Sequence, residues 1–553
     1  MAWPPFVGPL LCVLLYGLAG FYTSAYFMGD TMDYSKSIAE HIAGRNYFFW
    51  EFGHVLWRPL GFVLFKVAAP LAGRFVGANP QTGATLLLIC LSVMGGLVSV
   101  LSLFGVLNRI CRQKWPVLIA VVAFVGAHAF LNYAHSGTPY IPGLSCLLLA
   151  MYLLVAQSSK DKFAKVPALL AGASLAASGL FWFPYVFAIP AALISPLILL
   201  GYSSPRLKLV LSAAIAGALF GGAVYFGVML HIGIHNVADF RTWMQQTSRS
   251  TGAQNGGAAK MIFGFARSFI AMGNDGVLFK RYLLHDPFNP VSVWDLVRLS
   301  LWKLLGFYLF VLFLVLGLIT SPSGRRVFVL ILISWVPVLA FAMFWQGGDP
   351  ERYLPLYPLF FIGLCWALHA NPKKFLRYPL LLFVVVMLAT NVFMLSKRRL
   401  QRQQEVNVAR IDALIPLLKP ESRVFAANWQ DDLVNFNRSF PLNPINRTGS
   451  VRIAALITPG EDSVPHWPKD FWANAETIWN SGGDVWISKR LLLAGPRADS
   501  NWVEGDDRRV SWTDLFNYSS KLELGQSVGG DDGFALLLPS DNNKKYMSEY
   551  GKR

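Results

Sequence analysis

The chain alternates between long apolar runs and short polar connections over most of its length, and it becomes polar toward its C-terminus. A helix needs about 20 mostly apolar residues to cross a hydrocarbon core of ~30 Å. About eleven runs approach that length, and they lie at 6–27, 84–107, 116–134, 139–157, 166–181, 183–201, 208–231, 300–320, 327–345, 354–369 and 378–396. The pattern therefore predicts a polytopic α-helical membrane protein.

One further stretch, Arg58–Gly77, is apolar but short, and proline and charged residues interrupt it. Such a segment is typical of an amphipathic helix in the headgroup region. From about Lys397 the character changes, and helical and strand patterns of a small soluble fold follow. The predicted pieces are helices at Glu405–Ile415 and Phe471–Trp479 and strands at Arg423–Ala427, Val485–Ser488 and Ala535–Leu538. We therefore expect a transmembrane domain at 1–396, with external loops 28–83 and 231–299, and a C-terminal extramembrane α/β domain at 397–553.

Composition supports the membrane assignment, since 54% of the residues are hydrophobic, 14% are charged and mean hydropathy is +0.44. The net charge of +17 is concentrated in short loops rather than in a nucleic-acid-binding face, so nucleic acid is not an expected partner. The basic residues of these loops are Arg109, Arg112, Lys114, Lys160, Lys162, Lys165, Arg206, Lys208, Arg325, Arg326, Lys373, Lys374 and Arg377.

The positive-inside rule places those loops in the cytoplasm. The stretch after the first span, the long loop 231–299 and the C-terminal segment then lie on the opposite, periplasmic or lumenal face. We expect a bacterial inner-membrane protein with a periplasmic C-terminal domain. Counting Arg58–Gly77 as a crossing would instead move the stretch at Asp30 to the basic face, and the rule alone does not decide between these interpretations.

Metal and disulfide chemistry have little support in the sequence. The five cysteines lie in or beside apolar runs, which excludes a disulfide framework in the polar C-terminal segment. His231 and His235 have the i, i+4 spacing of metal ligands, but no third ligand lies near them in the chain. The sequence therefore predicts no cofactor, and it leaves a divalent metal possible without indicating one.

Asp30 and Asp33 follow the first apolar run directly, so both carboxylates are expected near the headgroup level. Ionisable residues in such a place are candidates for function. The alternative is that Asp30 only caps a helix at Met32–Ala43. A second polar segment, Trp345–Pro358, carries Asp349, Glu351 and Arg352 before another apolar run, where the planar fork of Arg352 can bind a phosphate. The alternative here is that Arg352 reaches lipid phosphates while Tyr353 and Tyr357 are interfacial belt residues.

These two segments resemble motifs of the GT-C membrane glycosyltransferases, and the protein mannosyltransferase and aminoarabinose transferase branch is the most similar. The resemblance rests on Asp-x-x-x-Tyr at Asp30–Tyr34, the stretch AGRNYFFWEFGH, Pro59–Leu60 and the loop Arg352–Pro358. It extends over the topology from Met1 to about Ser396. It implies transfer of a sugar from a polyprenyl-phosphate carrier to an acceptor on the outer face of the membrane; the acceptor, a protein, a lipid or a glycan, stays open.

The resemblance also implies roles for particular residues. Asp30 takes the place of the general base or acceptor-orienting residue, and Arg352 is expected to contact the carrier phosphate. Thr31 stands where the family usually has a second acid, and Asp33 competes as the base. The residues expected to bind substrate are Tyr34, His54, Arg58, Lys280, Arg281, Glu351, Arg352 and Tyr353.

The chemistry is consistent with a single displacement, because a phosphate leaving group needs a cation rather than an acid, and one carboxylate suffices as base. Two other functions were weighed: a secondary transporter and a non-catalytic envelope polysaccharide assembly protein. Transporters tend to have ionisable residues inside spans and repeated halves, whereas these spans are nearly free of acids and show no repeat. The sequence therefore favours a glycosyltransferase.

Overall fold

The computed structural model describes residues 6–25, 30–44, 49–76, 80–111, 113–246, 257–272, 279, 282–283, 291–370, 374–428, 452–457, 467–489, 517–531 and 533–551. The chain divides into two compact units. The first comprises Met1–Asp275 and Leu299–Lys397, and the second comprises Gly276–Arg298 and Arg398–Arg553. Each unit is described by itself.

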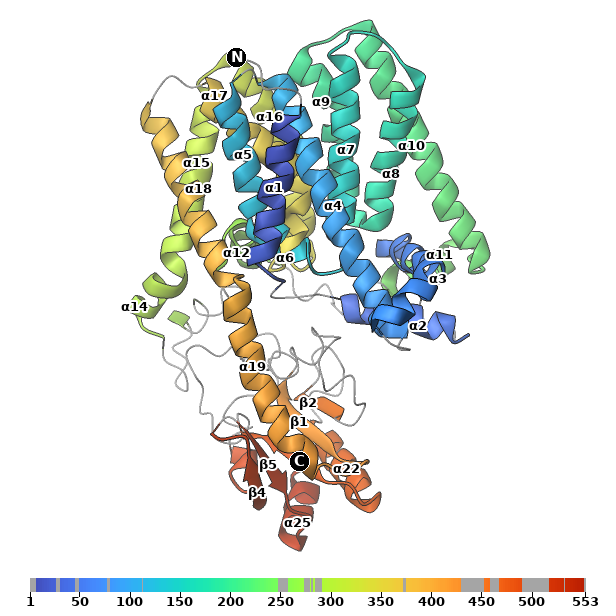
Figure 1. Cartoon of the computed structure of the whole chain (residues 1–553), viewed down its shortest axis with the longest axis vertical. Helices are drawn as coiled ribbons and strands as arrows, with labels where there is room; N and C mark the ends of the chain where they lie inside the picture. Colours follow the sequence, from blue (N-terminus) through green and yellow to red (C-terminus); the bar gives the residue numbers. More distant parts are fainter. Residues whose placement is uncertain are drawn as a thin grey trace. The chain divides into compact units, whose positions relative to one another are not determined.

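The first unit is a bundle of helices (Figure 1). Its α-helices are α1 (Val7–Tyr22), α2 (Thr31–Ile42), α3 (Trp57–Val76), α4 (Pro80–Ile110), α5 (Lys114–Gly126), α6 (His128–Tyr133), α7 (Tyr140–Ser158), α8 (Lys165–Phe181), α9 (Ile189–Leu200), α10 (Ser204–His231), α11 (Val237–Gln246), α12 (Ala258–Phe269), α15 (Trp302–Ile319), α16 (Pro322–Phe344), α17 (Tyr357–Ala370) and α18 (Lys374–Met394). Short turns of 3₁₀-helix are η1 (Phe52–His54), η2 (Phe183–Phe187) and η5 (Pro350–Leu356). The segment η4 (Val297–Leu301) leads into α15, and the short helix α14 (Val293–Leu296) that precedes it belongs to the second unit.

Seven helical stretches in the described part of the chain are long and apolar enough to cross a bilayer. They are Pro80–Ile110, Tyr140–Ser158, Phe183–Leu200, Ser204–His231, Val293–Ile319, Pro322–Phe344 and Phe375–Met394. The chain is therefore an integral, multi-pass membrane protein, but the predicted count of about eleven spans is not confirmed. The predicted run 116–134, for example, is divided because Ala127 has an extended backbone with φ −68° and ψ 138°.

Close helix packing organises this unit. Helices α4, α7, α8 and α10 lie side by side, each against the next (Figure 1). A Cβ atom at Gly172 of α8 would lie 2.5 Å from the carbonyl oxygen of Ala213 on α10, so only glycine allows this approach. Small residues that permit close backbone contact are typical of helix packing in membranes. At one end of the unit, α2 and α3 pack against each other and against α4 (Figure 1).

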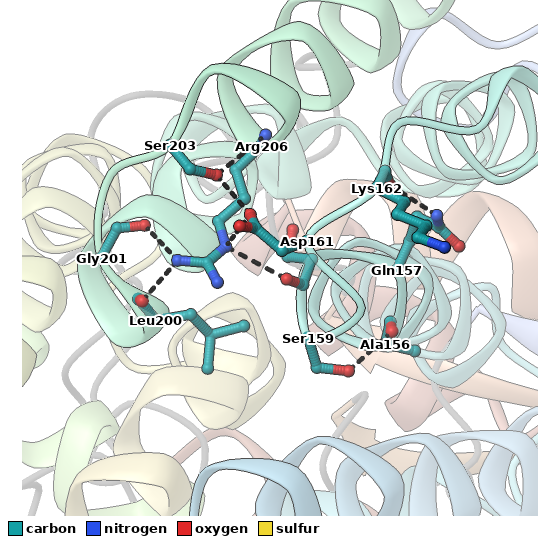
Figure 2. Close-up of polar contacts among 10 residues, drawn as sticks. Ala156, Gln157, Ser159, Asp161, Lys162, Leu200, Gly201, Ser203 and Arg206 are labelled. Atoms are coloured by element: carbon teal, nitrogen blue, oxygen red, sulfur yellow. Dashed lines mark hydrogen bonds and ion pairs between the residues drawn. The ribbon is translucent and has the colours of Figure 1, made fainter.

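The loops α7–α8 and α9–α10 are tied together at the end of the unit that carries basic residues (Figure 2). Ser203 donates a 2.6 Å hydrogen bond from Oγ to Asp161 Oδ1, and the Nε of Arg206 lies 3.5 Å from the same oxygen. Arg206 also donates to the carbonyl oxygens of Ser158, Leu200 and Gly201. We assign this charged residue a structural role, because its donors are directed at loop carbonyls.

The second unit contains a mixed five-stranded sheet of order β2-β1-β3-β5-β4. Its strands are β1 (Arg423–Asn428), β2 (Arg452–Ile457), β3 (Val485–Ser488), β4 (Leu524–Val528) and β5 (Phe534–Leu537), and its helices are α19 (Lys397–Leu414), η6 (Ile415–Leu417), α22 (Trp467–Asn480) and α25 (Asp541–Tyr550). Strand β1 pairs in parallel with β2 and β3, while β5 pairs antiparallel with β3 and β4. The three predicted strands are present at β1, β3 and β5. Strands β2 and β4 were not predicted, and in β4 the sequence LGQSV has no alternating apolar pattern.

Candidate functional site

Asp30 occupies the N-cap position of α2, yet its side chain makes no capping hydrogen bond. Instead, the hydroxyl groups of Tyr34 and Tyr140 each lie 3.5 Å from its Oδ2 and donate to it. Tyr34 is one turn further along α2, whereas Tyr140 begins α7. Helix capping therefore does not account for the Asp30 carboxylate, which is held by two tyrosines from different helices.

The surroundings of Asp30 make its carboxylate unusually basic. Part of the Asp30 surface is exposed to solvent, but many protein atoms lie around its carboxylate and displace water from it. Loss of solvation, followed by the negative charges of Asp33, Glu51 and Glu351, raises the pKa of Asp30 to about 6, although Arg352 acts in the opposite direction. Such a carboxylate is ionised at neutral pH and still has a useful affinity for a proton. These are the properties of a general base.

Arg352 lies in η5 and directs its guanidinium toward this region. Its Nη2 donates a hydrogen bond to Gln346 Oε1 and lies 3.9 Å from Asp349 Oδ2, and the guanidinium carbon is 5.7 Å from the centre of the Trp182 ring. The Nε atom is buried and has no hydrogen-bond partner among the residues that the structure describes. The arginine is thus held in place by its neighbours, and one of its donors is still unused.

Glu351 connects this loop to the end of α6. Its Oε2 accepts a 2.6 Å hydrogen bond from the hydroxyl of Tyr133, and both side chains are buried. The Tyr133 ring packs edge-on against Tyr140, with 5.1 Å between ring centres. Because Tyr140 also donates to Asp30, a chain of contacts runs from the loop of Arg352 to the candidate base.

Tyr353 and Tyr357 are fully buried, so neither is an interfacial belt residue. The hydroxyl of Tyr353 donates to the carbonyl oxygens of Gly347 at 2.6 Å and Met261 at 2.9 Å. This side chain fixes the turn that carries Gln346 and Arg352. A direct contact between Tyr353 and substrate, as the sequence predicts, stays a prediction.

His54 and Arg58 lie beside Tyr34. Arg58 forms a 2.5 Å ion pair with Glu51, and its guanidinium is 4.8 Å from the centre of the Tyr34 ring. The Nδ1 atom of His54 is 3.1 Å from the carbonyl oxygen of Phe181, and its ring packs edge-on against Tyr34. Burial lowers the pKa of His54, so the imidazole is neutral at pH 7. In this structure both predicted binding residues contact protein groups around Tyr34.

Two other predicted binding residues, Lys280 and Arg281, lie outside the described residues. Within the described part, no group of three or more His, Cys, Asp or Glu side chains has an arrangement that could hold a metal ion. His231 packs its ring 5.6 Å from that of Trp50.

Sequence reasoning missed several side chains of the site. Tyr133 and Tyr140 lie near the ends of the loop NYAHSGTPYIP, which resembles an ordinary turn, and Trp182 lies in the stretch LFWFPYVFAIP, whose pattern is typical of a turn or an interfacial aromatic belt. Glu51 was present in a quoted motif but was given no role. Two tyrosines at the two ends of one polar loop were the available signal, since tyrosine can pack and donate a hydrogen bond at once.

Together these groups combine a basic carboxylate, a fixed guanidinium and tyrosine donors around one region. The carboxylate can accept a proton from a hydroxyl group, and the guanidinium can stabilise an anion that develops on phosphate oxygen. Transfer of a group from a phosphate ester is chemistry that suits this arrangement.

Comparisons with known proteins found no matching family model and no matching curated protein. Among solved structures, the chain is similar to ArnT from Cupriavidus metallidurans in the apo state, with 9% identity, a TM-score of 0.47 and coverage of 98% of each chain. The same protein bound to undecaprenyl phosphate gives 11% identity, a TM-score of 0.47 and coverage of 97% of this chain and 98% of that one. An oligosaccharyltransferase of Archaeoglobus fulgidus, in complex with Zn and sulfate, gives 12% identity, a TM-score of 0.40 and coverage of 88% of this chain and 68% of that one.

Proposed function

We propose that this chain is a membrane glycosyltransferase that moves a sugar from a polyprenyl-phosphate-linked donor to an acceptor on the outer, periplasmic face of the membrane. The observation that carries the proposal is the Asp30 carboxylate, which does not cap its helix and has a pKa raised to about 6. It is close enough to Arg352 for the charge of the guanidinium to act on its pKa. The motif resemblance at Asp30–Tyr34 and Arg352–Pro358 supports the same assignment.

The reaction is a single displacement. Asp30 accepts the proton of the acceptor group while the acceptor oxygen or nitrogen attacks the anomeric carbon. The bond between that carbon and the phosphate oxygen breaks, and its electron pair leaves with the polyprenyl phosphate. Arg352 stabilises the negative charge that grows on the departing phosphate, so no acid is needed at the leaving group. Asp33, one turn from Asp30 and exposed, is the alternative base.

Reconstituted protein supplied with radiolabelled polyprenyl-phosphate sugars tests this function. Label that appears in an acceptor without crossing the bilayer supports glycosyl transfer. Vectorial uptake of label without covalent transfer would instead support the transporter, and neither result with any sugar would favour a non-catalytic role in envelope assembly.

Tyr140→Phe should lower kcat by about fivefold and leave the KM for the donor unchanged. The variant keeps the ring but removes a hydroxyl that donates to Asp30, and a hydrogen bond of this length is worth ~1 kcal/mol. Single-turnover assays with the labelled donor measure the effect. Tyr152→Phe, at the other end of α7, is the matched control, and equal rates in both variants would contradict a role for Tyr140.

The proposed topology predicts an external C-terminal segment, because the basic loops are expected in the cytoplasm. A cysteine at exposed Ser520, in a background with exposed Cys90 changed to Ser, should react with an impermeant maleimide in intact spheroplasts. A cysteine at exposed Lys162, in a basic loop, should react only after permeabilisation. The reverse pattern of labelling would overturn this topology.

A further inference from the structure

The backbone around Glu51 is held by two aromatic side chains that take no part in the proposed chemistry. Trp243 of α11 donates from Nε1 to the carbonyl oxygen of Trp50 at 2.8 Å. Tyr225 of α10 donates from its hydroxyl to the carbonyl oxygen of Phe52 at 3.2 Å. The Trp50 carbonyl belongs to the peptide group that precedes Glu51, and the Phe52 carbonyl belongs to the peptide group between Phe52 and Gly53, so the backbone is fixed from outside both before and after Glu51.

Aromatic packing strengthens the same attachment. The ring centre of Phe52 lies 5.5 Å from Tyr225, 5.4 Å from Trp243 and 5.8 Å from Phe240. Edge-on and tilted ring pairs at these distances are favourable beyond simple burial. The segment from Trp50 to Phe52 is therefore anchored to α10 and α11 and does not depend on η1 alone for its position.

From Glu51 a line of contacts leads to the candidate base. Glu51 pairs with Arg58 at 2.5 Å, and the guanidinium of Arg58 lies over the Tyr34 ring at 4.8 Å. The hydroxyl of Tyr34 then donates to Asp30 Oδ2. The side chains of Glu51 and Arg58 are only 14% and 7% exposed, so water screens their pairing weakly.

We propose that Tyr225 and Trp243 are positioning residues that hold the Glu51–Arg58 pair against Tyr34 and thereby set the place and charge environment of Asp30. The proposal rests on the proposed function of Asp30 as base. It assigns a role to α10 and α11, which are remote from Asp30 in sequence and contribute no group to the reaction. Without these two donors, the Glu51 carboxylate and the Arg58 guanidinium can separate and move toward water.

Several charged and titratable groups face Asp30 from the elements around it. Asp33 and Tyr34 come from α2, Tyr140 from α7, Glu51 precedes η1, and Glu351 and Arg352 come from η5. Asp33, Glu51 and Glu351 all raise its pKa. Release of Glu51 removes one of these three negative neighbours, so Asp30 should then ionise at lower pH.

The test uses the pH dependence of thermal unfolding, which needs no substrate. The difference in melting temperature between a protein and its Asp30→Asn counterpart reports the ionisation of Asp30. In the wild-type background this difference should change between about pH 4 and pH 6 and level off above the folded-state pKa of about 6. In the Tyr225→Phe/Trp243→Phe background the pH at which the difference levels off should fall by about half a pH unit, and kcat for sugar transfer should fall on the order of tenfold with unchanged donor KM.

A matched control background is Tyr308→Phe/Trp335→Phe. Tyr308 also donates its hydroxyl to a backbone carbonyl, that of Ile262, and Trp335 is a buried indole whose Nε1 has no hydrogen-bond partner in the described part of the chain. In this control the difference should still level off near pH 6. An unchanged levelling-off pH in the Tyr225→Phe/Trp243→Phe variant, even with a lower melting temperature, would reduce these residues to structural packing and overturn the inference. Retention of transfer by Asp30→Asn alone would instead overturn the proposed base.

Discussion

Asp30→Asn is expected to abolish sugar transfer, with a loss of at least about 100-fold in kcat. The amide keeps the size of the side chain and can still accept hydrogen bonds from Tyr34 and Tyr140, but it cannot take the proton of the acceptor. The Asp30→Asn variant should still bind polyprenyl phosphate, because the proposed contact of that phosphate is with Arg352 and not with Asp30. Transfer assays together with displacement of a labelled carrier separate the two effects.

The same substitution should stabilise the protein at neutral pH. The pKa of Asp30 is raised from 3.8 to about 6 in the folded state. Its contribution to stability is therefore fully present below about pH 4 and is lost as the pH rises through 6. Asp30→Asn should raise the melting temperature at pH 7.5 and change it little at pH 3.5. A larger rise in melting temperature at pH 3.5 than at pH 7.5 would show that ionisation of Asp30 does not destabilise the folded protein.

Asp33→Asn is the natural comparison, because Asp33 is exposed on the same helix. It should lower the transfer rate by a smaller factor. Transfer that persists in the Asp30 variant and vanishes in the Asp33 variant would reassign the base. Persistence in the double variant would remove the enzymatic interpretation of this segment.

Arg352→Ala should raise the KM for the donor by roughly 100-fold, and Arg352→Lys by roughly tenfold, since hydrogen bonds to a charged group are worth about 1.5–3 kcal/mol. Lysine keeps the charge but lacks the planar fork that matches phosphate. The alanine variant would also remove the contacts that Arg352 makes with Gln346 and Asp349. Competition between labelled donor and polyprenyl phosphate measures the affinity.

The exposed Arg326, in the first turns of α16, supplies the control for this experiment. Arg326→Ala should bind the donor as the wild type does. Wild-type affinity in Arg352→Ala would mean that Arg352 does not hold the phosphate. Arg267, Lys280 and Arg281 of the long loop would then become the candidates.

The sequence singles out Asp30 and Arg352 as candidates because each interrupts an apolar pattern. Both stand directly beside an apolar run, where an ionisable side chain is costly unless it has a function. Local sequence could not show whether Asp30 caps α2. That question is decided by Tyr140, which reaches Asp30 across 110 residues of sequence.

The other residues of the site were not predicted, because their residue types occur equally in membrane interfaces and in binding sites. Tyr133, Tyr140 and Trp182 are as suitable for a membrane interface as for a binding site, and only the packing of α6, α7 and η2 distinguishes these roles. The predicted number of spans is not confirmed for a related reason. A hydropathy average does not detect a single extended residue such as Ala127, which separates α5 from α6.

The hydrogen bond between Tyr133 and Glu351 joins residues that are 218 positions apart. At ~5–20 residues per second, a ribosome needs roughly 10 to 40 s to synthesise that interval. Asp30 and Tyr133 are therefore synthesised well before Arg352, the residue to which the carrier phosphate is assigned in the proposed function. Under that proposal the site is completed late in translation, and a chain released before residue 352 should not transfer sugar.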